Sequence, residues 1–392
     1  MTAVAAGGPD QSGGAETIDR VVRDRSIVVC CGSGGVGKTT TAAAVALQAA
    51  RIGRSACVVT IDPARRLANS LGLGTLTNRP TRIDGPWTGE LHALMLDAKG
   101  TFDDLVRRYS DSDQQAEDIR VNRIYANLTG TLSGTQEYMA MEKLYELVEE
   151  GGFDVVVVDT PPSRNALDFL DAPRRLTHFL ENRIFQALMK PTRAGLRFMG
   201  VAAQALLRTI SRVAGADIVG DAVAFFQAFE GMEEGFRLRA ARVRELLAQD
   251  GTAFVLVASP RPDSVDEAVH FAGKLAESDM SVTALVVNRL QPRFADDDQL
   301  DRLEAAAGDP GTPFGQLVEN LRGYTAAADR EERAYAELVA KVAPAPVYRV
   351  PLLNTDVHDL GGLAAVADLL FTPPEPAAAP PDGPAGGGAP ER

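Results

Sequence analysis

A glycine-rich loop that ends in lysine and threonine is the segment of this sequence best suited to chemistry. It follows the apolar run 26–31, precedes an alanine-rich stretch, and reads Gly32-Ser33-Gly34-Gly35-Val36-Gly37-Lys38-Thr39. Glycines let backbone N–H groups turn inward around phosphate oxygens, and the start of a following helix adds partial positive charge. The Lys38 ammonium can reach β- and γ-phosphates, and the Thr39 hydroxyl can ligate Mg²⁺. The loop is therefore expected to be a P-loop that binds ATP with Mg²⁺.

The same glycines also fit the GxGxxG pattern of dinucleotide-binding folds. Asp62, near the end of the next apolar run, would then take the place of the ribose-binding acid. However, the Lys38-Thr39 pair has no role in a dinucleotide-binding fold and an essential one in a P-loop. The P-loop is therefore the favoured interpretation.

Two aspartates at the ends of apolar runs complete the expected site. Asp159 directly follows the valine-rich run 153–158, the Walker-B pattern of a carboxylate that holds Mg²⁺ through water. Asp62 follows the run 56–61 and precedes Pro63. Because the carboxyl ends of parallel strands meet at one edge of the sheet, both carboxylates are expected near the P-loop. From residue types alone, Asp62 is either a site residue or a helix-capping aspartate.

The elements that must position these residues are short apolar runs that alternate with helical stretches. The runs are rich in Val, Ile, Leu and Ala without polar alternation, and they span 26–31, 56–61, 91–96, 153–158, 253–258, 282–287 and 347–350. Strands of this kind are covered on both faces, which is typical of a parallel sheet. The sequence therefore predicts an α/β fold, a P-loop NTPase with a mostly parallel, helix-covered sheet and a helical mid-chain insertion.

One ATPase domain is expected over residues 21–371, between disordered tails at 1–20 and 372–392. The tails are rich in Gly, Ala, Pro and polar residues, which cannot bury a core. Segment 165–249 shows no strand pattern and is expected to be an inserted helical subdomain. Its large apolar residues include Phe169, Phe179, Phe185, Phe198, Phe225, Phe226, Phe229, Phe236, Met189, Met199 and Met232. They fit either a packed core or an exposed groove for a hydrophobic client, and composition alone favours the core.

Composition argues against several classes of protein. The formal net charge of −13 disfavours sequence-independent nucleic-acid binding, which needs a concentrated basic surface. No apolar stretch is long enough to span a bilayer, so no integral membrane segment is expected. Residues 1–20 lack the basic and apolar regions of a secretory signal, which favours a cytoplasmic location. Cys30, Cys31 and Cys57 fall in strand-like runs without a CxxC, so no structural metal is expected.

Together these residues resemble the ArsA-type ATPases. That family includes the arsenite-pump ATPase and the eukaryotic targeting factor for tail-anchored membrane proteins, and it is related to the MinD and ParA ATPases. The resemblance extends from about residue 26 to residue 370. Its most specific segments are 34–40, 62–64 and 159–162, and the weaker ones are 286–288 and 350–353.

The resemblance implies a role for each matching position. Asp62 would lie in switch I and orient the attacking water, with Lys38 as the second catalytic residue. Asp159 would belong to switch II and, with the P-loop threonine, hold Mg²⁺. Asn288 would recognise adenine, and Pro351 would pack beside the base. The phosphates of ATP would contact Gly34-Gly35-Val36-Gly37-Lys38-Thr39-Thr40.

The sequence departs from the family at two points. Relatives usually carry lysine at the position of Ser33, and that lysine reaches across a dimer to the partner's phosphates. Relatives of the targeting type often carry a zinc-binding CxxC, which is absent here. A homodimer of this chain would lack a cation from position 33. Either turnover is slow, or another residue supplies the cation, or the chain works in a heterodimer with a paralogous ATPase. The intact P-loop and Asp62 favour the heterodimer.

The leading functional hypothesis is a dimeric ATP-hydrolysing switch that couples its ATP state to binding of a hydrophobic or membrane-protein client. Contacts of the γ-phosphate with the loops at Asp62 and Asp159 would drive it. One alternative is the soluble ATPase of an anion or arsenite efflux system, for which strand cysteines are poorly placed. Another is a MinD- or ParA-like positioning protein, for which residues 372–392 offer no amphipathic membrane helix. A third is a weakly active structural partner in a heterodimer.

Overall fold

Eight strands in the described part of the chain form one sheet. The computed structural model describes residues 17–62, 66–122, 125, 135–161, 225 and 232–371. The strands are β1 (Ile27–Gly32), β2 (Ser55–Thr60), β3 (Thr81–Ile83), β4 (Glu90–Met95), β5 (Val155–Asp159), β6 (Thr252–Ala258), β7 (Ala284–Leu290) and β8 (Val347–Pro351). Their order is β3-β4-β2-β5-β1-β6-β7-β8, and of these β3 alone runs antiparallel to its neighbour. The expected mostly parallel sheet is confirmed.

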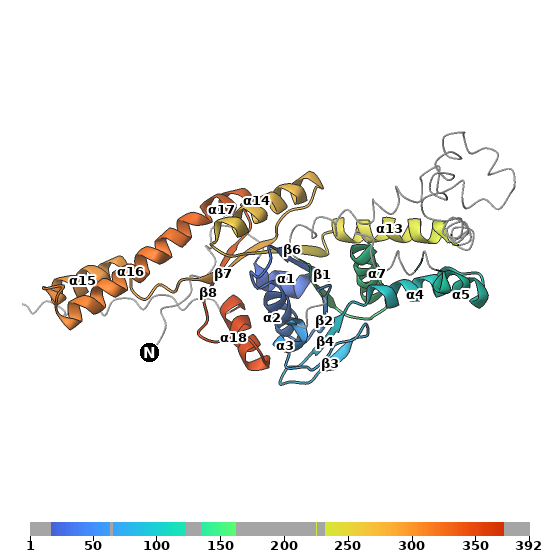
Figure 1. Cartoon of the computed structure of the whole chain (residues 1–392), viewed down its shortest axis with the longest axis horizontal. Helices are drawn as coiled ribbons and strands as arrows, with labels where there is room; N and C mark the ends of the chain where they lie inside the picture. Colours follow the sequence, from blue (N-terminus) through green and yellow to red (C-terminus); the bar gives the residue numbers. More distant parts are fainter. Residues whose placement is uncertain are drawn as a thin grey trace, which may run out of the picture.

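One face of the sheet is covered by a helix layer built on an alanine-rich helix. The layer comprises α1 (Ile18–Asp24), α2 (Lys38–Arg51), α3 (Arg66–Ser70) and α18 (Leu360–Phe371) (Figure 1). Helix α2 buries its alanines and Val45 against β1, β2 and β5. These small side chains let the helix that begins with Lys38 lie close to the sheet.

The opposite face carries a second layer and a second core. This layer comprises α7 (Thr135–Glu149), α13 (Glu233–Ala248), α14 (Pro262–Glu277) and α17 (Ala336–Val342). Successive strand residues point to opposite faces, so Cys30 lies in the first core and Cys31 in the second. The sheet is thus apolar on both faces, as the unbroken valine-rich runs predict.

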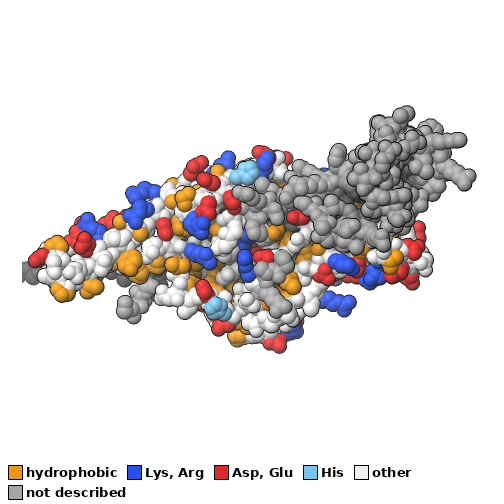
Figure 2. All heavy atoms as spheres, viewed as in Figure 1, with side chains coloured by type: hydrophobic (Ala, Val, Ile, Leu, Met, Phe, Trp, Pro, Cys, Tyr) orange, Lys and Arg blue, Asp and Glu red, His pale blue; other side chains and the backbone are white. Residues whose placement is uncertain are grey.

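Helices also extend beyond both ends of the sheet (Figure 1). At one end, α4 (Ala98–Tyr109) and α5 (Asp113–Val121) pack with α7 and α13 around a third apolar cluster. At the other end, α15 (Asp297–Ala307) and α16 (Pro313–Ala334) form a long hairpin, here called the arm. Figure 2 shows hydrophobic side chains along this arm, where the exposed residues include Phe294, Phe314, Leu317 and Tyr324.

The expected element boundaries differ from the observed ones in two instructive places. Each of the seven apolar runs overlaps a strand, but β3 was not expected, because a strand of three residues is too short to show a pattern. Helix α1 begins at Ile18, inside the segment 1–20 expected to be a tail. Ile18 is buried, and its N–H donates to the Tyr348 hydroxyl at 2.7 Å. The folded part of the chain therefore begins before residue 21.

The expected helical insertion at 165–249 is described only at residue 225 and from residue 232 onward. There α13 is helical, and Phe225, Met232 and Phe236 are buried in the third apolar cluster. These three side chains support the packed-core interpretation. The tail 372–392 lies outside the described part of the chain. So do the other large apolar residues of the expected insertion, which are Phe169, Phe179, Phe185, Phe198, Phe226, Phe229, Met189 and Met199.

Candidate nucleotide-binding site

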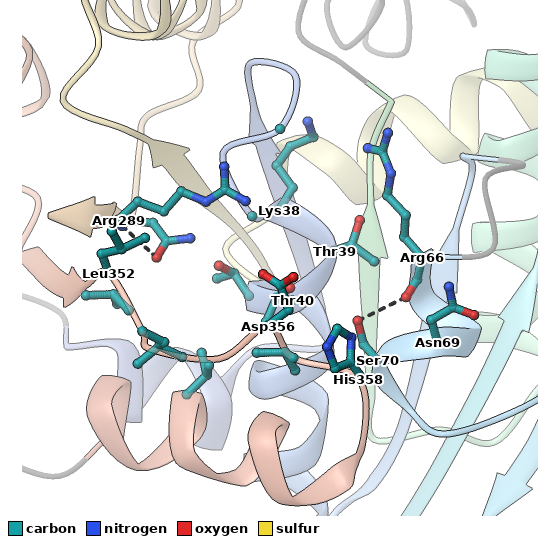
Figure 3. A pocket seen from close by; sticks show the side chains of 18 of the residues that line it. Lys38, Thr39, Thr40, Arg66, Asn69, Ser70, Arg289, Leu352, Asp356 and His358 are labelled. Carbon is teal, nitrogen blue, oxygen red and sulfur yellow. Dashed lines mark hydrogen bonds between the residues drawn. The ribbon is translucent and has the colours of Figure 1, made fainter.

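The ends of three central strands bring the predicted site residues to one edge of the sheet. Asp159, the last residue of β5, is in register with Thr60 of β2 and Cys30 of β1. A cavity of about 650 Å³ opens above this edge, and it is called the main cavity below (Figure 3). Its lining includes the predicted residues Gly35, Gly37, Lys38, Thr39, Thr40, Asp62, Asn288 and Pro351.

Two glycines allow the loop between β1 and α2 to take its shape. Gly32 has a φ of +146°, and a Cβ there would lie 1.9 Å from the Val257 carbonyl oxygen. Gly37 has a φ of +102°, and a Cβ there would lie 2.2 Å from Nδ2 of Asn288. Both positions exclude any side chain. The loop therefore turns tightly from the sheet into α2, which begins at Lys38.

Lys38 folds back over the loop that precedes it. Its Nζ donates to the Ser33 carbonyl oxygen at 2.8 Å, and the residue is only 7% exposed. Burial lowers the pKa of Lys38, while the charge of Asp159 opposes that shift. The ammonium is thus held at the wall of the main cavity, close to a carboxylate beneath it.

Asp159 presents an oxygen that suits a metal ion. The residue is buried, and its Oδ2 accepts from the Thr60 hydroxyl at 2.8 Å. Its Oδ1 is also buried and has no hydrogen-bond partner among the described residues. Burial raises the pKa of Asp159 to about 6, against the lowering effect of Thr60 and Thr39. A buried carboxylate oxygen beside a threonine hydroxyl fits the oxygen ligands that Mg²⁺ prefers, directly or through water.

Asp62 lies at the rim of the main cavity together with an arginine. Its backbone N–H donates to the Thr60 hydroxyl at 3.2 Å, which ties it to the end of β2. The Nη1 of Arg66, the first residue of α3, lies 3.5 Å from Oδ2 of Asp62. The Asp62 side chain is 19% exposed and that of Arg66 is 60% exposed. Both side chains therefore remain accessible to a molecule in the cavity.

The predicted adenine residues lie at the ends of β7 and β8. Asn288 donates from Nδ2 to the Val36 carbonyl oxygen at 2.7 Å, so it links β7 directly to the P-loop. Arg289 follows at a bulge in the β7–β8 pairing and has a φ of +64°, which is unusual for a residue with a side chain. Pro351 ends β8 and lines the main cavity, as expected for a residue beside a bound base.

A second, smaller cavity lies on the other side of the P-loop. This side cavity has a volume of about 400 Å³, and its lining includes the predicted residues Gly34 and Val36. Ser33 is 5% exposed there, and its hydroxyl donates to the Ser264 hydroxyl at 2.9 Å. Ser264 in turn accepts the backbone N–H of Ser259 at 3.0 Å. The position of the family lysine is thus filled by a buried, neutral hydrogen-bond network.

Several residues of the main cavity were not anticipated from the sequence. They include Arg66, Asn69, Ser70, Arg289, Asp356 and His358, all of which are labelled in Figure 3. Arg66 could have been suspected, because it follows Asp62 by only four residues. The direction of Arg289 depends on its left-handed backbone, for which the sequence gives no signal.

Comparisons with known proteins identify the family of this chain. A family model described as anion-transporting ATPase matches residues 25–308. The ATPase GET3 of Podospora anserina is 24% identical over 363 residues, which cover 91% of this chain and 94% of the relative. The ATPase ASNA1 homolog of Dictyostelium discoideum is 23% identical over 92% of this chain and 94% of the relative. The ATPase get3 of Aspergillus terreus is 31% identical over 146 residues, 36% of this chain and 41% of the relative.

Proposed function

Because this chain belongs to the anion-transporting ATPase family, we propose that it is a Mg²⁺-dependent ATP switch that controls binding of a hydrophobic or membrane-protein client. The chain is an ATP-hydrolysing P-loop enzyme. The observation that carries the switch proposal is one hydrogen bond. Gln136 at the start of α7 donates from Nε2 to the Ile61 carbonyl oxygen at 2.9 Å, immediately before Asp62.

Each group of site residues would have its own role in hydrolysis. The P-loop amides and Lys38 would hold the phosphates, and Asn288 and Pro351 would hold the base. Thr39 and Asp159 would hold Mg²⁺, which lowers the cost of the negative charge that develops on the phosphates. Asp62, at the cavity rim, would orient the attacking water and accept its proton.

The Gln136 contact joins this site to the helices beyond the sheet. Helix α7 begins beside the Asp62 loop, and its Tyr138 and Met139 pack in the third apolar cluster. The Tyr138 ring lies 6.4 Å from that of Phe236 on α13. A γ-phosphate that moves the Asp62 loop would therefore pull on α7 and alter the packing of α13. Such a coupled element is the physical requirement for a nucleotide switch.

We propose two kinds of partner for this chain, a hydrophobic client and a second ATPase chain. A client with apolar surface is supported by the Phe- and Met-rich composition of residues 165–249. A second copy or a paralogous ATPase is supported by the exposed apolar residues of the arm, because such patches usually meet a partner. No helix in the described ranges is long and apolar enough to cross a bilayer. We propose that the chain acts in the cytoplasm.

The alternative of an arsenite-binding efflux ATPase is less well supported. All three cysteines of the chain, Cys30, Cys31 and Cys57, are fully buried within strands. Burial raises the pKa of Cys57 to about 12 and raises those of Cys30 and Cys31 well above the usual value. Soft metalloids need accessible thiolates that converge on one site. These thiols are protonated and enclosed, and Cys30 and Cys31 face opposite cores.

Hydrogen exchange in the presence of ATP and of ADP tests the switch. Exchange in α7 and α13 should differ between the two states in the wild-type chain. Gln136→Ala should abolish most of that difference while leaving ATP binding intact, because it removes the contact with the Ile61 carbonyl. Gln114→Ala is a matched control, since Gln114 bonds Asp118 on the surface of α5.

The results separate the two interpretations of the helical region. Equal and strong protection with ATP and with ADP would show that α7 and α13 form an ordinary packed core. A nucleotide-dependent difference that survives in Gln136→Ala would show that coupling takes another route, and the role given to Gln136 would be wrong.

A further inference from the structure

We propose that Arg66 is a catalytic residue that supplies, from within the same chain, positive charge to the γ-phosphate during hydrolysis. The proposal rests on the placement of ATP in the main cavity proposed above. Arg66 is the first residue of α3 and lines the same cavity as Lys38, Thr39 and Asp62.

The Arg66 guanidinium lies near the two groups proposed to act on the water and on the phosphates, Asp62 and Lys38. Its Nη1 is 3.5 Å from the Asp62 carboxylate, the group proposed to orient water. Its charge also acts on the Lys38 ammonium, which faces the phosphates. In Figure 3, Lys38 lies between Arg66 and Arg289, and both arginines extend toward the P-loop. Arg66 approaches from the Asp62 side, where the terminal phosphate would lie.

The pairing with Asp62 is loose. A separation of 3.5 Å and a side chain that is 60% exposed describe a surface ion pair, which adds little to stability. An arginine held only loosely by one carboxylate can turn its remaining N–H groups toward a second anion. Guanidinium groups have a planar set of donors that matches phosphate oxygens.

The other charged groups in reach do not serve this purpose. Lys38 is nearly enclosed and would contact the phosphates from the P-loop side. Arg289 also extends toward the P-loop, but it does so from beside Asn288, the side assigned to the base and opposite to Asp62, and it lines the side cavity as well. Ser33 is neutral, and its hydroxyl already donates to Ser264. Arg66 is therefore the cation of the described lining best placed between the terminal phosphate and the water.

The chemistry requires such a charge. The water oxygen forms a bond to the γ-phosphorus as the bond from that phosphorus to the bridging oxygen breaks, and ADP leaves with the electron pair. One proton of the water passes to Asp62 and then to the phosphate product. Negative charge is spread over the γ-phosphoryl oxygens and the bridging oxygen in the transition state. Arg66 would stabilise that charge more in the transition state than in bound ATP.

The test uses the full chain with Arg66→Ala and Arg66→Lys, and with Arg79→Ala as the control. Arg79 is exposed in the loop before β3, outside both cavities. Steady-state ATP hydrolysis gives kcat and KM, and calorimetry gives the affinities for ADP and for ADP with aluminium fluoride, which mimics the transferring phosphoryl group. Thermal unfolding checks that each variant is folded.

We expect Arg66→Ala to lower kcat by about 10²-fold, as loss of one transition-state donor does elsewhere. Affinity for ADP should stay unchanged, and the tighter binding seen with aluminium fluoride should disappear. Arg66→Lys should retain part of both effects, and Arg79→Ala should match the wild type. An unchanged kcat in Arg66→Ala, or an equal loss of affinity for ADP with and without aluminium fluoride, would overturn the proposal.

Failure of the switch proposal would look different. If the wild-type chain hydrolyses ATP but hydrogen exchange in α7 and α13 is the same with ATP and ADP, then the switch is wrong and Arg66 is still assigned by its own variants. If hydrogen exchange differs between ATP and ADP but kcat is the same in Arg66→Ala and the wild type, then the switch proposal stands and the role given to Arg66 is wrong.

Discussion

Two pairs of residues on opposite sides of the P-loop, Asp62 with Arg66 and Ser33 with Ser264, differ in charge and in burial. On the side of the main cavity, Asp62 and Arg66 are accessible and carry opposite charges around a space open to solvent. On the side of the side cavity, Ser33 and Ser264 are buried and neutral, and they share one hydrogen bond. Ser33 belongs to the P-loop itself, whereas Asp62 and Arg66 come from the segment that follows β2, so the difference arises from the chain segments that line each side.

We propose that the electrostatic contribution to hydrolysis comes from the main cavity. Charge that acts on a transition state must be close to the reacting atoms and aimed before the reaction begins. The side cavity contributes no charge through position 33, whereas the main cavity contributes two groups from the loop and first turn after β2. With Arg66 in the proposed role, such a chain would stabilise the γ-phosphate from its own residues, and a partner's lysine would not be required.

Lys38→Ala should produce the largest change, because Lys38 serves both sides. Its Nζ bonds the Ser33 carbonyl, and its ammonium faces the main cavity. We expect kcat/KM for ATP to fall about 10⁴-fold, since a ground-state contact and a transition-state contact are lost together. Calorimetry with Mg-ATP checks the binding part. Lys341→Ala on the exposed surface of α17 is the control, and wild-type affinity in Lys38→Ala would refute the P-loop assignment.

Asp62→Asn should have the next largest effect and should act on hydrolysis alone. The amide keeps the shape of the side chain but cannot accept a proton from water. We expect single-turnover hydrolysis to slow by about 10²- to 10³-fold, which lies within the usual range of general-base effects. Binding of ATP should be retained. Asp84→Asn, at a side chain that is 94% exposed, is the matched control. Unchanged hydrolysis would reduce Asp62 to a structural residue.

The sequence predicts the sheet well because buried strands leave a strong pattern. Seven apolar runs become strands, and the residues that follow them meet at one edge, as parallel strands require. The pattern fails where an element is too short or too near a polar tail. β3 has three residues, and α1 buries only Ile18, Val21 and Val22 after a segment rich in Gly.

The candidate site is predictable only in part, for a physical reason. Residues that belong to a motif, such as Lys38 and Asp159, follow from spacing, because the chemistry fixes the residue type and the strand fixes the place. Arg66 and Arg289 lie outside any motif. One enters the cavity from the first turn of a helix, and the other through a left-handed bulge, so their direction depends on backbone geometry. Residue types alone also gave no sign that Ser33 is buried.

Ser33→Lys sharpens the comparison by placing a charge at position 33, where the wild-type side chain is buried and neutral. In the wild-type chain we expect little gain in kcat, because Arg66 already supplies a cation. In the Arg66→Ala background, Ser33→Lys should recover part of the lost kcat if two chains associate across the P-loop. A large gain in the otherwise wild-type chain would favour the heterodimer hypothesis, in which a paralogue normally supplies this lysine. Analytical ultracentrifugation with ATP establishes the oligomeric state of each variant.

Ser33→Ala should produce the smallest change. It tests the Ser33 hydroxyl without altering any charge. The substitution removes one neutral hydrogen bond, while Ser264 keeps the backbone N–H of Ser259 as a partner, so no backbone group loses its hydrogen bond. We expect a loss of about 1 kcal/mol in the free energy of unfolding and no change in kcat. Urea unfolding and steady-state hydrolysis measure the two effects, with the exposed Ser281→Ala as control. A marked fall in kcat without a comparable loss of stability would show that the Ser33 hydroxyl takes part in hydrolysis, and the two sides of the P-loop would then share the chemistry.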